Sequence, residues 1–272
     1  MKAFPNLHAA GLASIIAAAL CGAPVMALAD DFAVAASPPR FELTAKPGSR
    51  LREVLEIDNA APSAASYLMK TAEWSLDVNG GAVFSDALKP DSCRPWVAIE
   101  RGDITVPGHG SYRFRFEVTP PAAAPRGECR FAILIEGKGQ PVKTKAGLAF
   151  PVSGRIGIIV YLAVGDVRPQ LEIIGGGVGA VGGEPRPVLR VRNSGNAHGR
   201  LEGFLHGVDA KGVKIDFTPA TLPILAGETR IIPLNIEQPD KTRPIHIAWP
   251  ITIHGKMFWA GGSTTFSQAF VP

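Results

Sequence analysis

The chain has 272 residues, of which 46% are apolar and 19% are charged, with a net charge of +4 and an isoelectric point near 9.0. Its 30 glycines and 24 prolines are spread along the chain, which is typical of short-stranded β proteins and excludes a low-complexity polymer. No Lys/Arg run of the nucleic-acid-binding kind occurs, so no nucleic-acid partner is expected, and the positive charge serves either solubility or an acidic partner.

The first 29 residues have the features of a secretory signal peptide. Lys2 supplies the positive charge, residues 9–21 form an apolar core, and residues 27–29 (Ala-Leu-Ala) form a cleavage site before Asp30. We therefore expect export across the inner membrane, a periplasmic location and a mature chain that begins at Asp30. Its length suits one large β domain or two domains of about 120 residues each.

Two cysteines, Cys93 and Cys129, follow the predicted signal peptide. An even number of cysteines in an exported protein indicates a disulfide. Cys93 shares strand parity with Val97, and Cys129 shares it with Phe131, so both thiols are expected to point into one core. We predict a disulfide between Cys93 and Cys129.

Residues 30–165 show the period-two alternation of β-strands and no convincing helical period. In the clearest case, alternate residues from Tyr112 to Val118 form one apolar face, with charged residues between them. Strands are predicted over 32–43 (broken at Pro38 and Pro39), 51–58, 67–76, 83–84, 96–100, 112–118 and 130–136, followed by a basic loop over 137–145 that carries Lys138, Lys143 and Lys145.

Residues 147–165 are the most apolar stretch outside the predicted signal and are expected to form one long strand or two collinear ones. The alternate apolar residues that we single out on one face are Leu148, Phe150, Val152 and Ile156. Pro151 cannot donate a backbone hydrogen bond, which places the first half at a sheet edge. A chain that keeps an exposed apolar edge usually pairs it with another chain, so we interpret this strand as the working part of the molecule.

A membrane-spanning helix is the alternative for the same stretch, which is long enough to cross a bilayer. Pro151, Ser153 and Arg155 interrupt it, and glycines are scattered through it. We therefore expect no membrane span.

The second half repeats the pattern of the first after a predicted hinge at 165–169. The segment 54–59 (VLEIDN) has a counterpart in 188–193 (VLRVRN), and each is an alternating strand that ends in asparagine. The fold class is therefore predicted to be all-β, with two tandem immunoglobulin-like β-sandwich domains over 30–165 and 166–272. Strands of the second domain are expected near 170–174, 187–193, 199–206, 213–217, 229–236, 245–253 and 263–271.

Motifs for catalysis, cofactors or metals fail on their context. Residues 177–182 match G-x-G-x-x-G, but Pro185 and Pro187 follow where a helix must begin, so we interpret 175–183 as a flexible loop between strands. The histidines lie outside metal-ligand spacings, and no G-x-S-x-G nucleophile motif occurs. We predict that the protein is not an enzyme and takes no cofactor or metal.

Two motifs of the first half resemble those of a known family, the PapD-like periplasmic pilus-assembly chaperones of the chaperone–usher pathway. Residues 95–116 (PWVAIERGDITVPGHGSYRFRF) resemble the proline–apolar strand, Pro-Gly turn and arginine-containing strand of that family. Residues 125–131 (PRGECRF) are similar to its P-x-D-R-E-S-x-F signature. Glu128 and Phe131 match this signature, Cys129 takes the place of the serine, and Arg126-Gly127 replaces the Asp-Arg.

A third stretch, 147–161, stands where the family has the last strand of its first domain. The resemblance covers most of residues 33–165 and is weaker beyond 166. It implies two immunoglobulin-like domains and donor-strand complementation, in which the chaperone lends an edge strand to a subunit that lacks one. The implied partners are pilus, fimbrial or coat-like secreted subunits and an outer-membrane usher.

The resemblance also implies a pair of cations that bind the carboxylate at the C-terminus of the subunit. Arg40 corresponds to the arginine of the first strand. A direct count puts Gly157 at the position of the second cation, a lysine in the family, and Arg155 is the nearest cation of the same parity. The donor residues implied are Leu148, Phe150, Val152 and Ile156. A surface salt bridge for Arg155, and ordinary core positions for the apolar residues, remain the alternatives.

A non-chaperone structural surface protein or adhesin built of immunoglobulin-like domains is the rival interpretation. A pilus subunit would be expected to lack a strand or to offer an N-terminal donor extension. Here the segment before Pro38 is short, and both domains have a full set of predicted strands.

Overall fold

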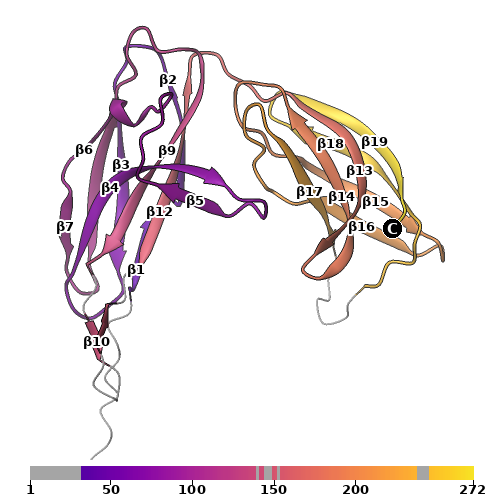
Figure 1. Cartoon of the computed structure of the whole chain (residues 1–272), viewed down its shortest axis with the longest axis horizontal. Coiled ribbons are helices and arrows are strands. Elements are labelled where there is room, and N and C mark those ends of the chain that lie inside the picture. Colours follow the sequence, from indigo (N-terminus) through magenta and orange to yellow (C-terminus); the bar gives the residue numbers. More distant parts are fainter. Residues whose placement is uncertain (1–31, 139–140, 144–148, 152–153, 238–244) are drawn as a thin grey trace, which may run out of the picture.

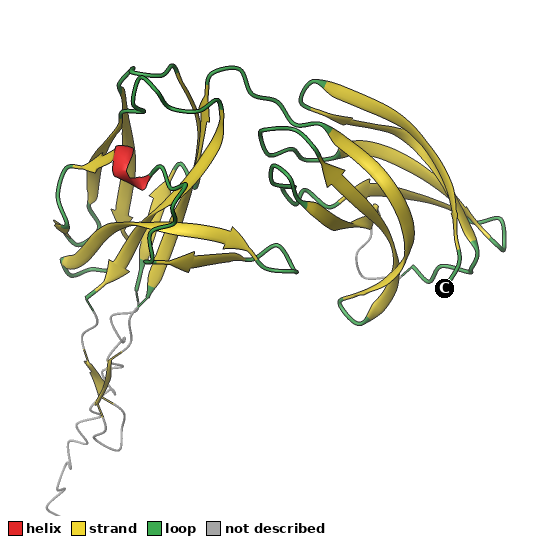
Figure 2. Ribbon diagram, turned by 45° about the horizontal axis from the view of Figure 1, so that its top comes forward, coloured by secondary structure: helices red, strands yellow, loops and turns green. Residues whose placement is uncertain are grey.

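The structure is a computed structural model, and it describes residues 32–138, 141–143, 149–151, 154–237 and 245–272. The predicted signal peptide, Leu148 and Val152 lie outside these ranges. The described chain is all-β and forms two immunoglobulin-like domains in tandem, as the sequence predicts (Figures 1 and 2). Apart from the short 3-10 turn η1 (Arg94–Trp96), the described elements are strands, and no helix among them could cross a membrane.

The first domain packs two sheets face to face (Figure 2). One sheet has the hydrogen-bonded order β1-β3-β8-β6, and the other has the order β2-β12-β9-β4-β5, with β7 also paired to β4. Strands β10 and β11 form a separate hairpin. The bounds are β1 Val34–Ser37, β2 Arg40–Ala45, β3 Leu51–Asn59, β4 Ala65–Leu76, β5 Ala82–Ser85, β6 Val97–Ile99, β7 Asp103–Val106, β8 Ser111–Val118, β9 Gly127–Gly137, β10 Pro141–Lys143, β11 Ala149–Pro151 and β12 Arg155–Val164.

Apolar side chains from both sheets fill the space between them. On β8, Phe114, Phe116 and Val118 are buried while the arginines between them are exposed, so the face predicted from the alternation is confirmed. Cys93 and Cys129 form a disulfide between the segment before η1 and β9 of the larger sheet, as the sequence predicts.

Two prolines divide the first strand between the two sheets. Strand β1 pairs antiparallel with β3, whereas β2 pairs parallel with β12. Pro38 and Pro39 lie between them and lack backbone N–H groups, so the ladder stops there, and the Ser37–Pro38 peptide is cis. The predicted interruption is confirmed, and its consequence is that the chain changes sheets at this point.

The second domain is one hydrogen-bonded series of seven strands in the order β13-β14-β17-β16-β15-β18-β19 (Figure 1). The strands curve around a core of aliphatic and aromatic side chains that includes Leu205, Phe217 and Phe270. The bounds are β13 Leu171–Val181, β14 Glu184–Asn193, β15 Glu202–Asp209, β16 Lys214–Pro219, β17 Thr229–Glu237, β18 Ile251–Trp259 and β19 Gly262–Phe270.

The two asparagines that marked the internal similarity occupy equivalent places in the two domains. Asn59 and Asn193 are both buried at the ends of β3 and β14. The amide of Asn59 donates to the carbonyl of Ser63 (2.8 Å), and its oxygen accepts the N–H of Ala61 (3.0 Å). Asn193 makes the same two bonds, to residues four and two positions further on, at 2.8 and 2.9 Å.

Of the two arrangements expected over 147–165, the structure has two strands and not one long strand. Ala149–Pro151 forms β11 and pairs with β10 in the hairpin, so part of the predicted basic loop is also a strand. The last strand of the first domain, β12, begins at Arg155. Pro151 cannot donate to a ladder and Gly154 has no side chain to pack, which favours a break between the two strands.

The prediction of a flexible loop over 175–183 is wrong. Strand β13 continues to Val181, paired with β14 except for an irregularity between Ile173 and Gly175, and the turn falls at Gly182 and Gly183. Both turn glycines have positive φ angles (62° and 84°), which residues with a Cβ rarely adopt. Glycine is a poor strand former alone, and here the neighbouring strand imposes the extended conformation.

The strand predicted over 245–253 begins later, at Ile251, and runs to Trp259. Pro250 has no N–H to contribute to a ladder, so pairing starts only after it. The apolar residues Ile245 and Ile247 lie before the strand and still pack against the core, which explains why their alternation suggested a strand.

Candidate functional site

Just under half of strand β12, the part before Ile159, has a free edge; we call this part the free half. Strand β12 pairs with β9 along its whole length, from Arg155 to Val164. On its other side β2 pairs only with Ile159–Val164, because β2 begins at Arg40 after the proline break. Within the described chain, residues 155–158 therefore have no strand partner on that side. A sheet edge with unpaired backbone groups is a template for a strand from another chain.

The side chains of this free half point to both faces of the sheet. Ile156 and Ile158 face the interior, where Ile158 belongs to the core of the first domain and Ile156 packs against it. Arg155 points to the other face, where its guanidinium lies 5.7 Å from the ring centre of Phe84 and its Nη1 lies 3.5 Å from Oε1 of Glu136. The chain therefore offers an extended backbone here with an ion pair on its outer face.

The residues predicted to donate side chains fall into three groups. Leu148 and Val152 lie outside the described residues. Phe150 lies in β11, with its backbone opposite Val142 of β10. Ile156 lies on β12 opposite Ile135, at the inner face. Their proposed role in a partner's groove remains a prediction.

A cleft of about 530 Å³ lies where the two domains meet. The first domain contributes Arg40 and Glu42 from β2, Glu128 from β9 and Tyr161 from β12. The second domain contributes the segment 197–200 between β14 and β15, together with residues of the connection between the domains. Arg40, predicted as an anchor, lies in this cleft, whereas Arg155 does not line it.

A buried pair, Glu128 and His198, joins the two domains. The exposed fractions of these side chains are 4% and 10%. The backbone N–H of His198 donates to both carboxylate oxygens at 3.2 Å, and its Nδ1 lies 2.5 Å from Oε2. The backbone N–H of Glu128 in turn donates to the carbonyl of Asn196 (2.9 Å). The glutamate that matches the family signature thus holds the second domain against the first.

The environment of His198 fixes which of its ring nitrogens carries the proton. Nη1 of Arg200 lies 2.8 Å from Nε2, and a guanidinium can only donate, so Nε2 accepts and Nδ1–H donates to Glu128. The imidazole stacks on the ring of Tyr161 with 3.8 Å between centres. Burial raises the pKa of the Tyr161 phenol above its ordinary value, although nearby Arg200 acts in the opposite direction.

Two arginines from different domains meet at one carboxylate in the cleft. Nε of Arg40 donates to Oε1 of Glu42 at 2.9 Å, and Nη1 of Arg200 lies 3.4 Å from the same oxygen. The side chains of Arg40 and Glu42 are 55% and 47% exposed, so this pair lies at the solvent rim of the cleft. Arg200 is only 19% exposed and lies over the ring of Tyr161 at 5.7 Å.

His198 and Arg200 were not predicted as site residues. Nothing in their local sequence distinguishes them from other charged residues of the second half, because their place beside β2 and β12 is created by packing of the domains. Their position soon after Asn193 offers the one signal, since that asparagine marks the repeated turn. A search of the three residues that follow each repeated turn would have found them.

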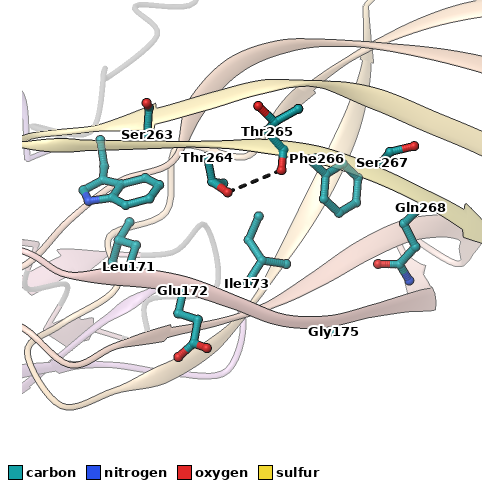
Figure 3. A pocket seen from close by; sticks show the side chains of 11 residues that line it. Leu171, Glu172, Ile173, Gly175, Ser263, Thr264, Thr265, Phe266, Ser267 and Gln268 are labelled. Atoms are coloured by element: carbon teal, nitrogen blue, oxygen red, sulfur yellow. Dashed lines mark hydrogen bonds between the residues drawn. The ribbon is translucent and has the colours of Figure 1, made fainter.

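A second groove of about 450 Å³ lies between the two end strands of the second domain, β13 and β19 (Figure 3). Hydroxyl and amide side chains of β19 line much of one wall, and Leu171, Glu172 and Ile173 line the other. A Cβ built on Gly176 would lie 2.7 Å from Oε1 of Gln268, so glycine makes room for this amide to reach β13. No group of three His, Cys, Asp or Glu residues that could hold a metal exists among the described residues.

No family model and no curated protein sequence matches the chain. Several solved structures of fimbrial chaperones resemble it in overall structure. CfaA, a class 5 fimbriae chaperone, is 13% identical with a TM-score of 0.47, over 88% of this chain and 99% of that chain. The CupB2 chaperone of Pseudomonas aeruginosa is 12% identical with a TM-score of 0.46, over 87% and 100%. The SafB chaperone complex with Salmonella enterica SafA pilin contains a chain that is 11% identical with a TM-score of 0.47, over 89% of this chain and 97% of that chain. At this level of similarity the function must be inferred from the chain's own residues.

Proposed function

We propose that the protein is a periplasmic chaperone that binds secreted pilus or fimbrial subunits through the free half of β12. The observation that carries the proposal is the free edge at 155–158, which lies on the same strand as the cleft residue Tyr161. A subunit that lacks a strand would add its sheet to this edge, and its end would reach the cleft. The role is one of binding and needs no catalytic group.

Strand addition draws its affinity from main-chain hydrogen bonds and its specificity from alternate side chains. In this proposal, Phe150, together with Leu148 and Val152, would present apolar groups to a groove in the subunit. Ile156 packs against its own core and would present only the part of its side chain that stays accessible. The part of β12 that β2 already covers stays with the chaperone's own fold. The bound subunit would then pass to an outer-membrane usher, and the predicted signal peptide would place the whole process in the periplasm.

The register of the added strand requires a fixed end, and Arg40 is proposed to supply it. Its guanidinium lies in the cleft and can form a charge-assisted hydrogen bond to a subunit's terminal carboxylate. Arg155 was predicted as the second anchor. It lies four residues before Ile159, the neighbour of Arg40, which is about 13 Å along the strand. Each arginine must therefore be tested separately.

Co-purification tests the proposal directly. The tagged chain is isolated from periplasm, and the proteins that accompany it are identified by mass spectrometry. We expect secreted β-sandwich subunits, with recovery about tenfold lower for Arg40→Ala because a charged hydrogen bond is worth about 1.5–3 kcal/mol. Arg155→Ala is measured in parallel.

Arg52→Ala is the matched control, because Arg52 is an exposed arginine in an ion pair with Glu117 on β8, in the other sheet. It should leave recovery unchanged. Unchanged subunit recovery with Arg40→Ala would contradict the proposed role of Arg40 in binding the terminal carboxylate. A chain found in surface fibres without any bound subunit would favour a structural surface protein.

A further inference from the structure

We infer that Arg200 of the second domain provides the second cation for a bound carboxylate, and that Glu42 occupies this site in the free protein. The inference rests on the proposed function, since it concerns the same cleft. It differs from the sequence-based expectation, which placed the second cation on β12 at Arg155.

The geometry around Glu42 is that of a carboxylate site with its ligand in place. One oxygen, Oε1, lies 2.9 Å from Nε of Arg40 and 3.4 Å from Nη1 of Arg200. The two guanidinium groups come from different domains, so a carboxylate held between them bridges the domains. The planar, permanently charged guanidinium is suited to carboxylates, and Arg200 is oriented in advance by Tyr161 and by Nε2 of His198.

Glu42 can be replaced by an incoming carboxylate at low cost. Its side chain is 47% exposed, and an ion pair this accessible to water contributes about 0–1 kcal/mol. A terminal carboxylate would take over both arginines while Glu42 turns to solvent. The exchange is one negative charge for another, so it leaves the charge of the cleft unchanged.

The remaining charges of the cleft make this exchange a condition for binding. The carboxylate oxygens of Glu128 already accept hydrogen bonds from His198, and Glu202 adds a further carboxylate to the cleft wall. With Glu42 in place, carboxylates balance the two arginines, and a free anion gains little by entering. Glu42 therefore lowers the affinity for a free anion by up to about fivefold, and a carboxylate that is held in position by an added strand competes best.

The test uses the full chain and propionate as the carboxylate probe. The Nε–H signals of Arg40 and Arg200 are followed by NMR during titration with sodium propionate at constant ionic strength, with propionamide as the uncharged control. We expect both signals to shift with one midpoint for propionate only. In Glu42→Gln the midpoint should fall, by up to about fivefold for an exposed pair worth 1 kcal/mol.

Two further variants complete the test. Arg200→Gln keeps a donor for His198 and should weaken the response of Arg40 to propionate. Glu117→Gln is the matched control, because Glu117 also bridges two arginines, Arg50 and Arg52, outside the cleft. It should leave the midpoint at Arg40 unchanged.

Three results would overturn the inference: a midpoint unchanged in Glu42→Gln, a shift of Arg40 without Arg200, or no effect of Arg200→Gln. Because the probe needs no subunit, the outcome is separable from the proposed function. A carboxylate site that responds as expected in a chain that captures no subunit would refute the chaperone role alone. Normal capture of the subunit by the original chain, in which neither arginine signal responds to propionate, would refute this inference alone.

Discussion

The two domains share a turn and differ at their edges. In each, a buried asparagine ends a strand, binds its own turn and donates to a distant carbonyl, that of Val106 (3.3 Å) in the first and Ile224 (2.9 Å) in the second. In the second domain the end strands β13 and β19 face each other across a groove. In the first, β2 covers only part of β12. The turn therefore belongs to the common scaffold, and function is to be sought at the edge that differs.

The largest expected effect on stability comes from removing the disulfide. Among the described residues, only the first domain has one. Cys93→Ser with Cys129→Ser removes a link across a sequence separation of 36, worth about 3.8 kcal/mol in the chain-entropy model. The free energy of unfolding of the first domain should fall by that amount, and that of the second should stay constant. Calorimetry with two resolved transitions measures both, and an equal loss in the two domains would contradict this assignment.

The next largest effect on stability is expected on replacing the two buried asparagines, one in each domain. Asn59→Ala and Asn193→Ala each remove a buried amide and leave several backbone groups without their partner. The expected loss is about 2–4 kcal/mol each, on the basis of about 1–3 kcal/mol for each unsatisfied buried group. Urea unfolding should show each variant weakening its own domain. If one substitution were neutral, the two turns would not be equivalent.

A smaller effect concerns the contact between the domains. His198→Ala removes the Nδ1–H donor to Glu128 and the ring that stacks on Tyr161. We expect a loss of about 2 kcal/mol, the range for a hydrogen bond to a charged group, and a wider spread of interdomain distances in small-angle scattering.

His206→Ala provides the control for that measurement. His206 is an exposed histidine that bonds to Asp216 within the second domain (2.8 Å), away from the other domain. Its replacement should leave the scattering profile unchanged. If both variants widened the spread of interdomain distances equally, the effect of His198→Ala could not be assigned to the contact between the domains.

The smallest effect is a pH dependence in the second domain. Burial alone would raise the pKa of Asp209, but backbone N–H groups of Val213, Ala248 and Lys211 donate to its carboxylate and lower the pKa below its ordinary value. A lowered pKa in the folded state stabilises the fold above the unfolded value near 3.9, and the contribution is lost as the pH falls. Asp209→Asn should therefore lower the melting temperature at pH 7, with the difference from the original chain shrinking towards pH 3. A difference that stays constant with pH would exclude this charge effect.

Much of the strand pattern could be predicted because strands such as β7 and β8 alternate between buried and exposed residues. The alternation in β8 and the parity of Cys93 and Cys129 identified core positions directly, and the repeated asparagine revealed the two related domains. The glycine run of β13 could not be predicted as a strand, because glycine carries no side-chain pattern and its extended conformation depends on β14. The late start of β18 was signalled by Pro250 and was missed.

The candidate site was predictable only where it depends on one strand. Arg40 follows the two prolines that move the chain to the second sheet, so its position in the cleft could be anticipated from its family counterpart. The arrangement of His198 and Arg200 depends on how two domains pack, which no local pattern encodes. The contact between Arg155 and Phe84 could not be predicted either, because Phe84 lies in a hairpin that is remote in sequence.

Hydrogen–deuterium exchange of β12 tests the central claim most directly. The chain is measured free and in complex with a secreted subunit that co-purifies with it, and the amides of 155–158 that do not bond to β9 are compared with those of β13. We predict rapid exchange at 155–158 in the free chain, strong protection in the complex, and no change in β13. Exchange at 155–158 that is the same with and without the subunit would contradict strand addition at this edge.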